Sequence, residues 1–114
     1  MEIQVQVDGR ALCERCTVAT NPLRRMQGLL GRKRLEHDEG ILLRPASSIH
    51  TAFMRFPIDA LFLDDEGRVL RVASDLKPWR AAGCRGARAV LELSAGESER
   101  RGVRPGDLVV PVGT

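Results

Sequence analysis

The stretch SSIHTAFMRFPIDALFLDDEG, residues 47–67, is the most apolar segment of the chain, and its pattern decides the fold. Pro57 divides the stretch in two, because proline has no backbone N–H to donate to a sheet. In the second half, apolar side chains occupy both alternating faces of residues 58–63, with Asp59 as the exception. This pattern predicts a strand that is covered on both sides.

Asp59 needs a partner in such a strand. A buried carboxylate without one destabilises a fold by several kcal/mol. The nearest cation of the same parity is Arg55, and Arg80 and His50 are the other candidates. We expect a guanidinium or imidazole to neutralise Asp59 and to turn its remaining hydrogen-bonding groups toward a solvent-filled hollow. The alternative is a buried ion pair with a purely structural role.

The first half of the stretch, residues 50–56, also alternates. His50, Met54 and Phe56 fall on one face, and Thr51 and Arg55 fall on the other. An imidazole, a hydroxyl and a guanidinium are thus expected around an apolar wall. Apolar walls with a few directed polar groups are typical of small-ligand pockets.

The segments around this stretch predict a mainly β protein. DDEG (64–67) is a turn between the strand at 58–63 and a strand at 68–73, and Asp8-Gly9 is a turn between strands at 2–7 and 11–18. Further strands are expected at 40–44, 88–93 and 106–112, with helices from Asn21 to Gly31 and, capped by Ser94, up to Gly102. DLKPWRAAGCRGA (75–87) is expected to be a loop. We predict one α+β, mainly β domain over residues 1–114, a partly closed barrel or clip of about seven short strands and two short helices.

Composition excludes several classes of protein. The net charge is +3, and the basic residues form no stripe with interleaved aromatic side chains, which disfavours nucleic acid as a partner. No apolar run approaches the roughly 20 residues of a membrane span. The N-terminus lacks the apolar core of a signal peptide, and Cys13, Cys16 and Cys84 are an odd number of cysteines. We therefore expect free thiols and a cytoplasmic location.

Four motifs carry a resemblance to a known family. RMQGLLGR, SSIHTAFMRFPIDALFLDDEGRVLRV, KPWR and AVLELSAGESERRGVRPGDLV follow in the order seen in the prokaryotic family called domain of unknown function 192. The resemblance covers about Val18 to Val110 and implies a compact, mostly β fold with no established activity. The positions that match the recurrent polar motif of the family are His50, Thr51, Met54, Arg55, Pro57, Asp59, Pro78, Trp79 and Arg80. The sequence departs from the family in its LCERC motif, and we expect it, unlike its exported relatives, to lack a leader.

A small-ligand-binding module for a sugar or a small anion is the function that these residues favour. Trp79 is the only tryptophan, and it lies beside Arg80 in the irregular segment 75–87. An indole stacks on a sugar ring, and a guanidinium grips a carboxylate or phosphate. If this segment folds over the strand, the two sets of residues line one cleft. The candidate ligand-binding residues are His50, Thr51, Met54, Arg55, Asp59, Trp79 and Arg80.

Three alternatives compete with this prediction. A protein-interaction module would use the basic residues Arg24, Arg25, Arg32, Lys33 and Arg34 to dock an acidic partner. An enzyme would use His50 as general acid or base, oriented by Asp59. Metal or redox chemistry at Cys13-x-x-Cys16 is disfavoured, because these two positions of a regular strand point to opposite faces. We expect no catalytic residue, metal or cofactor.

Overall fold

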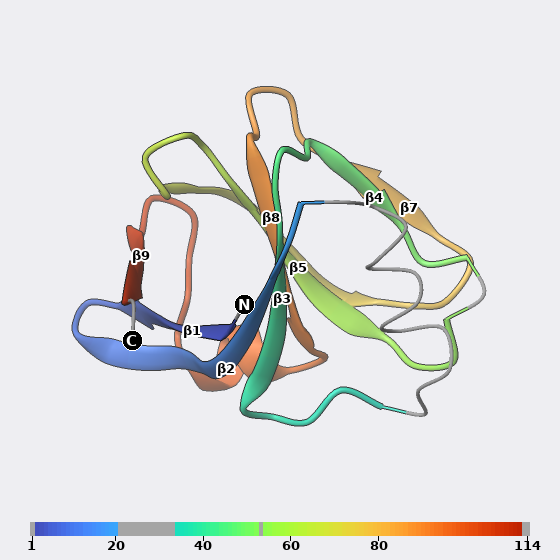
Figure 1. The fold of residues 1–114 in the computed structure, drawn as a ribbon. Coiled ribbons are helices and arrows are strands. Elements are labelled where there is room, and N and C mark those ends of the chain that lie inside the picture. Colours follow the sequence, from blue (N-terminus) through green and yellow to red (C-terminus); the bar gives the residue numbers. More distant parts are fainter. Residues whose placement is uncertain (1, 21–33, 53, 113–114) are drawn as a thin grey trace.

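A computed structural model describes residues 2–20, 34–52 and 54–112. Seven strands form one sheet in the order β6-β5-β8-β3-β2-β1-β9 (Figure 1). Neighbouring strands are antiparallel except β2 and β3, which are parallel. The strands of this sheet are β1 (Glu2–Val7), β2 (Arg10–Ala19), β3 (Glu39–Leu43), β5 (Ile58–Leu63), β6 (Val69–Leu76), β8 (Ala89–Ser94) and β9 (Val109–Val112). The prediction of a mainly β fold is confirmed.

The sheet curls until its first and last strands meet. The N–H of Val69 at the start of β6 donates to the carbonyl of Asp107 at 2.8 Å, and the N–H of Val109 in β9 donates to Gly67 at 2.8 Å. Gly67 has φ +92°, and any side chain there would collide with the Val109 carbonyl. These contacts produce the partly closed barrel that the sequence predicts.

Strand β5 separates two apolar cores, and all six of its residues are buried. Leu61 and Leu63 face the inside of the barrel, whereas Ile58 and Phe62 belong to a second cluster on the outer face of the sheet. The predicted burial on both sides is confirmed. At about 25 cal/mol per Å² of apolar surface, each of the larger side chains adds about 2 kcal/mol to stability.

A small second sheet (Figure 1) was not predicted, and Ile49 of this sheet belongs to the outer apolar cluster. The small sheet pairs β4 (Ser48–His50) with β7 (Ala81–Gly83). The predicted alternation over 50–56 is wrong, because the chain turns after His50 and the N–H of Met54 donates to the carbonyl of Thr51 at 3.2 Å. Segment 75–87 likewise contains β7 and is not all loop.

One short helix, α2 (Glu97–Arg100), lies in the described ranges, close to its predicted place. Its N-cap is Gly96 and not Ser94. The helix predicted from Asn21 to Gly31 lies outside the described residues. No helix among residues 2–20, 34–52 and 54–112 combines the length and the apolar character needed to cross a bilayer.

The cysteines of β2 correct another prediction. Ile3 pairs with Cys16 and Val5 pairs with Cys13, so β2 carries an extra residue relative to β1. This bulge turns both thiols into the barrel core, where both are fully buried, and not to opposite faces. A hydrogen bond with the Cys16 thiol, and then burial, raise the pKa of the Cys13 thiol far above its ordinary value. The thiol is therefore protonated and poorly suited to act as a nucleophile.

Candidate ligand-binding surface around Thr51

Thr51 is fully buried, and its hydrogen bonds connect segment 77–80 to the end of β4. Its hydroxyl donates to the carbonyl of Lys77 at 2.6 Å and accepts from the N–H of Arg80 at 2.9 Å. Its N–H donates to the carbonyl of Arg80 at 2.8 Å, and its carbonyl accepts from the N–H of Trp79 at 3.0 Å. Both the side chain and the backbone of Thr51 thus hold the KPWR segment against the end of β4.

The side chains of Trp79 and Arg80 project from this anchored segment. Trp79 is 60% exposed, and Arg80 is exposed as well. Trp79 has φ +63°, a left-handed conformation that costs a residue with a Cβ about 1–2 kcal/mol. The hydrogen bond of its N–H to Thr51 helps to hold it there. The fold therefore presents a large apolar ring to solvent on a strained but fixed backbone.

His50 and Arg55 lie on segments that contact Thr51 or its partners. His50 pairs with Ala81 in the small sheet, directly beside Arg80, and its side chain is exposed. Arg55 is also exposed and follows Met54, whose N–H donates to the carbonyl of Thr51. We call the exposed side chains of His50, Arg55, Trp79 and Arg80 the Trp79 surface. Met54 is buried in the outer apolar cluster and is not part of this surface.

The Trp79 surface is rich in positive charge. Arg80 donates one N–H to the carbonyl of Trp79 at 3.3 Å, which leaves most of its five donors for other partners. In the described ranges, the guanidinium of Arg55 makes no hydrogen bond or ion pair. Lys77 lies in the same segment and pairs with Asp75 at 2.8 Å. Forked cations beside an exposed indole suit a ligand with a flat apolar face and an anionic or polar group.

Asp59 lies apart from these exposed side chains and has different partners from those we predicted. Its Oδ1 accepts from the N–H of Asp75 at 2.9 Å. Its Oδ2 accepts from the N–H groups of Gly96 at 3.1 Å and Ser98 at 2.9 Å, and from the Ser98 hydroxyl at 2.6 Å. The expectation that a guanidinium or imidazole neutralises Asp59 is wrong. Four short hydrogen bonds solvate this carboxylate instead.

These contacts give Asp59 a positioning role. Asp75 ends the regular part of β6 with φ +53°, and its N–H is held by Asp59. Asp59 thus fixes the start of segment 75–80, and Thr51 fixes its end. Asp59 does not orient His50, so the acid–base pair proposed from the sequence does not form.

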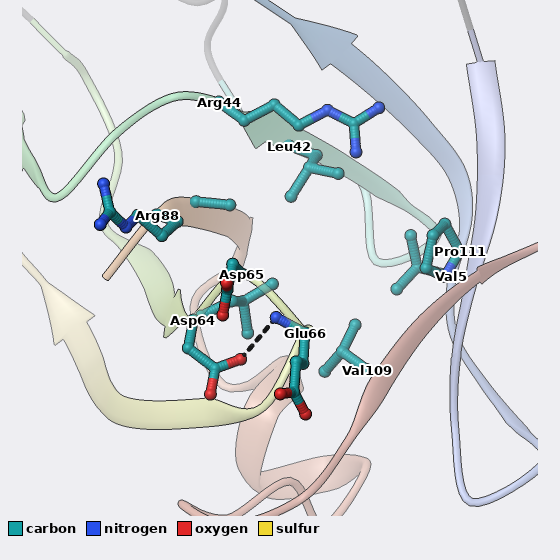
Figure 2. A pocket seen from close by; sticks show the side chains of 12 residues that line it. Val5, Leu42, Arg44, Asp64, Asp65, Glu66, Arg88, Val109 and Pro111 are labelled. Carbon is teal, nitrogen blue, oxygen red and sulfur yellow. Dashed lines mark hydrogen bonds between the residues drawn. The ribbon is translucent and has the colours of Figure 1, made fainter. Parts of the chain in front are cut away.

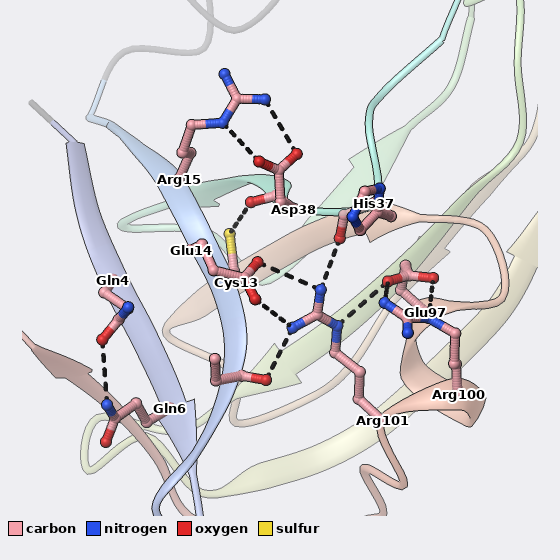
Figure 3. A network of polar contacts seen from close by, with 11 residues as sticks. Gln4, Gln6, Cys13, Glu14, Arg15, His37, Asp38, Glu97, Arg100 and Arg101 are labelled. Atoms are coloured by element: carbon pink, nitrogen blue, oxygen red, sulfur yellow. Dashed lines mark hydrogen bonds and ion pairs between the residues drawn. The ribbon is translucent and has the colours of Figure 1, made fainter.

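A second polar cluster, which the sequence analysis missed, joins β2 to α2 (Figure 3). The side chain of Arg101 is 10% exposed and pairs with Glu97 and Glu14, both at 3.2 Å. It also donates to the carbonyls of Ala11 at 2.8 Å and His37 at 2.9 Å. The protein itself uses these donors, so this cluster cross-links the fold.

The basic residues proposed to dock an acidic partner can be placed only in part. Residues 24, 25, 32 and 33 lie outside the described residues. Arg34 is exposed and pairs with Glu36 at 2.8 Å. Residues 2–20, 34–52 and 54–112 contain no cluster of three or more metal-ligating side chains.

The comparisons with known proteins agree with this fold. Residues 3–111 match the family model DUF192, described as Uncharacterized ACR. The chain belongs to the DUF192 family. No curated protein matches it.

Two crystal structures are similar along nearly the whole chain. The first is of a protein from Sinorhizobium meliloti 1021, described as "a putative transcription regulator". It is 27% identical with a TM-score of 0.86, over 100% of this chain and 96% of that one. The second, from Novosphingobium aromaticivorans DSM 12444, is described as a protein of unknown function. It is 25% identical with a TM-score of 0.82, over 96% of this chain and 84% of that one.

Proposed function

We propose that this DUF192 protein is a ligand-binding module that takes a sugar or a small anion at the Trp79 surface. The observation that carries the proposal is the exposure of Trp79, 60%, on a backbone that Thr51 holds in a left-handed conformation. At this exposure, much of the indole surface is available to a ligand. Strained backbone that the surrounding contacts enforce is common at ligand sites.

The chemistry of the neighbouring side chains supports a polar or anionic ligand. Arg55 and Arg80 supply forked donors, and His50 adds an imidazole ring with further hydrogen-bonding atoms. A sugar presents an apolar face to the indole and hydroxyls to these donors. A sugar acid such as glucuronate would use both, because its carboxylate fits a guanidinium.

Preorganisation is the second argument. The buried hydrogen bonds of Thr51 and Asp59 fix both ends of segment 75–80 before any ligand arrives. A surface that is already ordered loses little conformational entropy on binding. The buried hydrogen bonds of Thr51 and Asp59 therefore support a segment that is ordered in advance for a ligand.

An NMR titration tests the proposal. The ¹⁵N-labelled protein is titrated with glucose, galactose, glucuronate, acetate and phosphate, and the shifts of the indole N–H of Trp79 and the side-chain N–H of Arg80 are followed. We expect saturable shifts of both signals with at least one of these ligands. Absence of shifts at Trp79, Arg80 and His50 across the whole panel would refute the proposal.

A matched pair of variants separates stacking from a general loss of apolar surface. Trp79→Ala removes the exposed indole, and Leu70→Ala removes another exposed apolar side chain, 38% exposed, from β6. We expect Trp79→Ala to weaken binding about tenfold or more and Leu70→Ala to leave it unchanged. Equal effects of the two variants would count against stacking.

A further inference from the structure

A pocket of about 370 Å³ opens at one end of the barrel, away from the Trp79 surface. Its walls include Val5, Leu42, Leu63 and Val109, which also belong to the interior core of the barrel. These residues come from β1, β3, β5 and β9, so the pocket is the mouth of the barrel. Its volume falls in the usual range of small-ligand pockets, about 300–1,000 Å³.

Two arginines, Arg44 and Arg88, line this mouth. Arg44 follows β3 with the same parity as Leu42, so its side chain extends from the inner face of the sheet (Figure 2). In the part of the chain that the structure describes, its guanidinium makes no hydrogen bond or ion pair. A forked donor above apolar walls fits a carboxylate that carries an apolar chain.

The opposite rim limits the charge of the ligand. Asp64, Asp65 and Glu66, in the turn between β5 and β6, also line the pocket. Asp64 is committed to the turn, where it accepts from the N–H groups of Glu66 and Arg68, both at 2.9 Å. The three carboxylates outnumber the two guanidinium groups and repel a second negative charge, so a single carboxylate is favoured over a phosphate ester.

We propose that the barrel mouth binds a monocarboxylate with an apolar chain of medium length. The chain occupies the space between Leu42 and Val109, and the carboxylate accepts hydrogen bonds from Arg44. This site does not depend on the Trp79 surface, because none of its lining residues belongs to that surface.

Binding of octanoate tests this proposal, with 1-octanol and octyl phosphate as comparison ligands. Isothermal titration calorimetry gives the affinities, and methyl NMR locates the ligand. We expect octanoate to shift the methyl signals of Leu42 and Val109 and to bind more tightly than octyl phosphate. No binding of octanoate, or shifts confined to other residues, would overturn the proposal.

Two variants assign the parts of the site. Arg44→Gln is expected to weaken octanoate about tenfold and to leave 1-octanol unchanged, whereas Arg85→Gln, which removes an exposed arginine elsewhere, changes neither. Ala89→Leu fills part of the pocket and is expected to weaken both ligands, with its folding checked by urea denaturation. Octanoate affinity that survives both Arg44→Gln and Ala89→Leu would contradict the site. Trp79→Ala leaves octanoate binding intact, which separates this site from the Trp79 surface.

Discussion

Replacing Asp59 by Asn tests the role that the structure gives to this carboxylate. Asn keeps the shape of the side chain but has one acceptor oxygen. In its better orientation the amide oxygen faces the three donors of Gly96 and Ser98, and the NH₂ group faces the N–H of Asp75. Loss of the charge costs about 1 kcal/mol for each retained hydrogen bond. The opposed donors at Asp75 cost about 1–3 kcal/mol more. We therefore expect Asp59→Asn to lower the free energy of unfolding by about 4–6 kcal/mol, out of about 5–15 kcal/mol for a domain of this size.

Urea denaturation measures this loss, and other variants serve as controls. Asp65→Asn removes an exposed carboxylate from the β5–β6 turn and is expected to change stability by less than about 0.5 kcal/mol. Arg55→Gln and Arg80→Gln are expected to be equally mild, because neither guanidinium pairs with Asp59. A loss below about 1 kcal/mol in Asp59→Asn, or a large loss in either arginine variant, would refute the four-donor environment.

Three further predictions address other contacts. Thr51→Val keeps the shape of the side chain but leaves the N–H of Arg80 and the carbonyl of Lys77 without their partner. We therefore expect amide hydrogen exchange in segment 77–80 to speed up about tenfold or more. Thr51→Ser keeps the hydroxyl and is expected to preserve protection. Gly40→Ala places a Cβ 2.7 Å from the sulfur of Cys13, so we expect the free energy of unfolding to fall by about 1–3 kcal/mol. The double variant with Cys13→Ala is expected to recover part of this loss. Strictly additive losses in the two single variants would contradict the contact. Hydrogen bonds from Arg100, and then from Arg101, hold the pKa of Glu97 below its ordinary value. The resulting stability is present above the pKa of an unfolded glutamate, about 4.3, and is lost as the pH falls below it. Acid titration of Glu97→Gln should therefore show a smaller loss of stability below about pH 4.3 than the wild type, and identical acid profiles would contradict the assignment.

Local patterns in the sequence were sufficient to predict most of the main sheet. Apolar side chains on both faces of residues 58–63 predicted β5, and turn residues predicted the β1–β2 and β5–β6 hairpins. Strand β7 was missed because Ala81–Gly83 has little preference for a strand and pairs only with the distant β4. The Cys13–Cys16 orientation was wrong because parity rules assume a regular ladder, and a bulge shifts the pattern by one residue.

The sequence likewise predicted only part of the candidate site. The sequence identified Thr51 and Asp59 because polar side chains in an apolar segment need partners. It pointed to charged side chains as the partners of Asp59, whereas the structure supplies backbone N–H groups and a hydroxyl. Every residue except proline has a backbone N–H, so the composition does not reveal which N–H groups bind Asp59. Only the fold brings Asp75 and Ser98 to the carboxylate.

Intermolecular NOEs between glucuronate and the protein give the clearest evidence on the proposed function. With Trp79 as the only tryptophan, indole signals need no further assignment. We expect NOEs from the sugar-ring protons to the indole ring, which disappear in Trp79→Ala and weaken in Thr51→Val. Saturable binding whose NOEs arise away from Trp79, or ring NOEs that stay unchanged in Thr51→Val, would contradict a binding surface preorganised by Thr51.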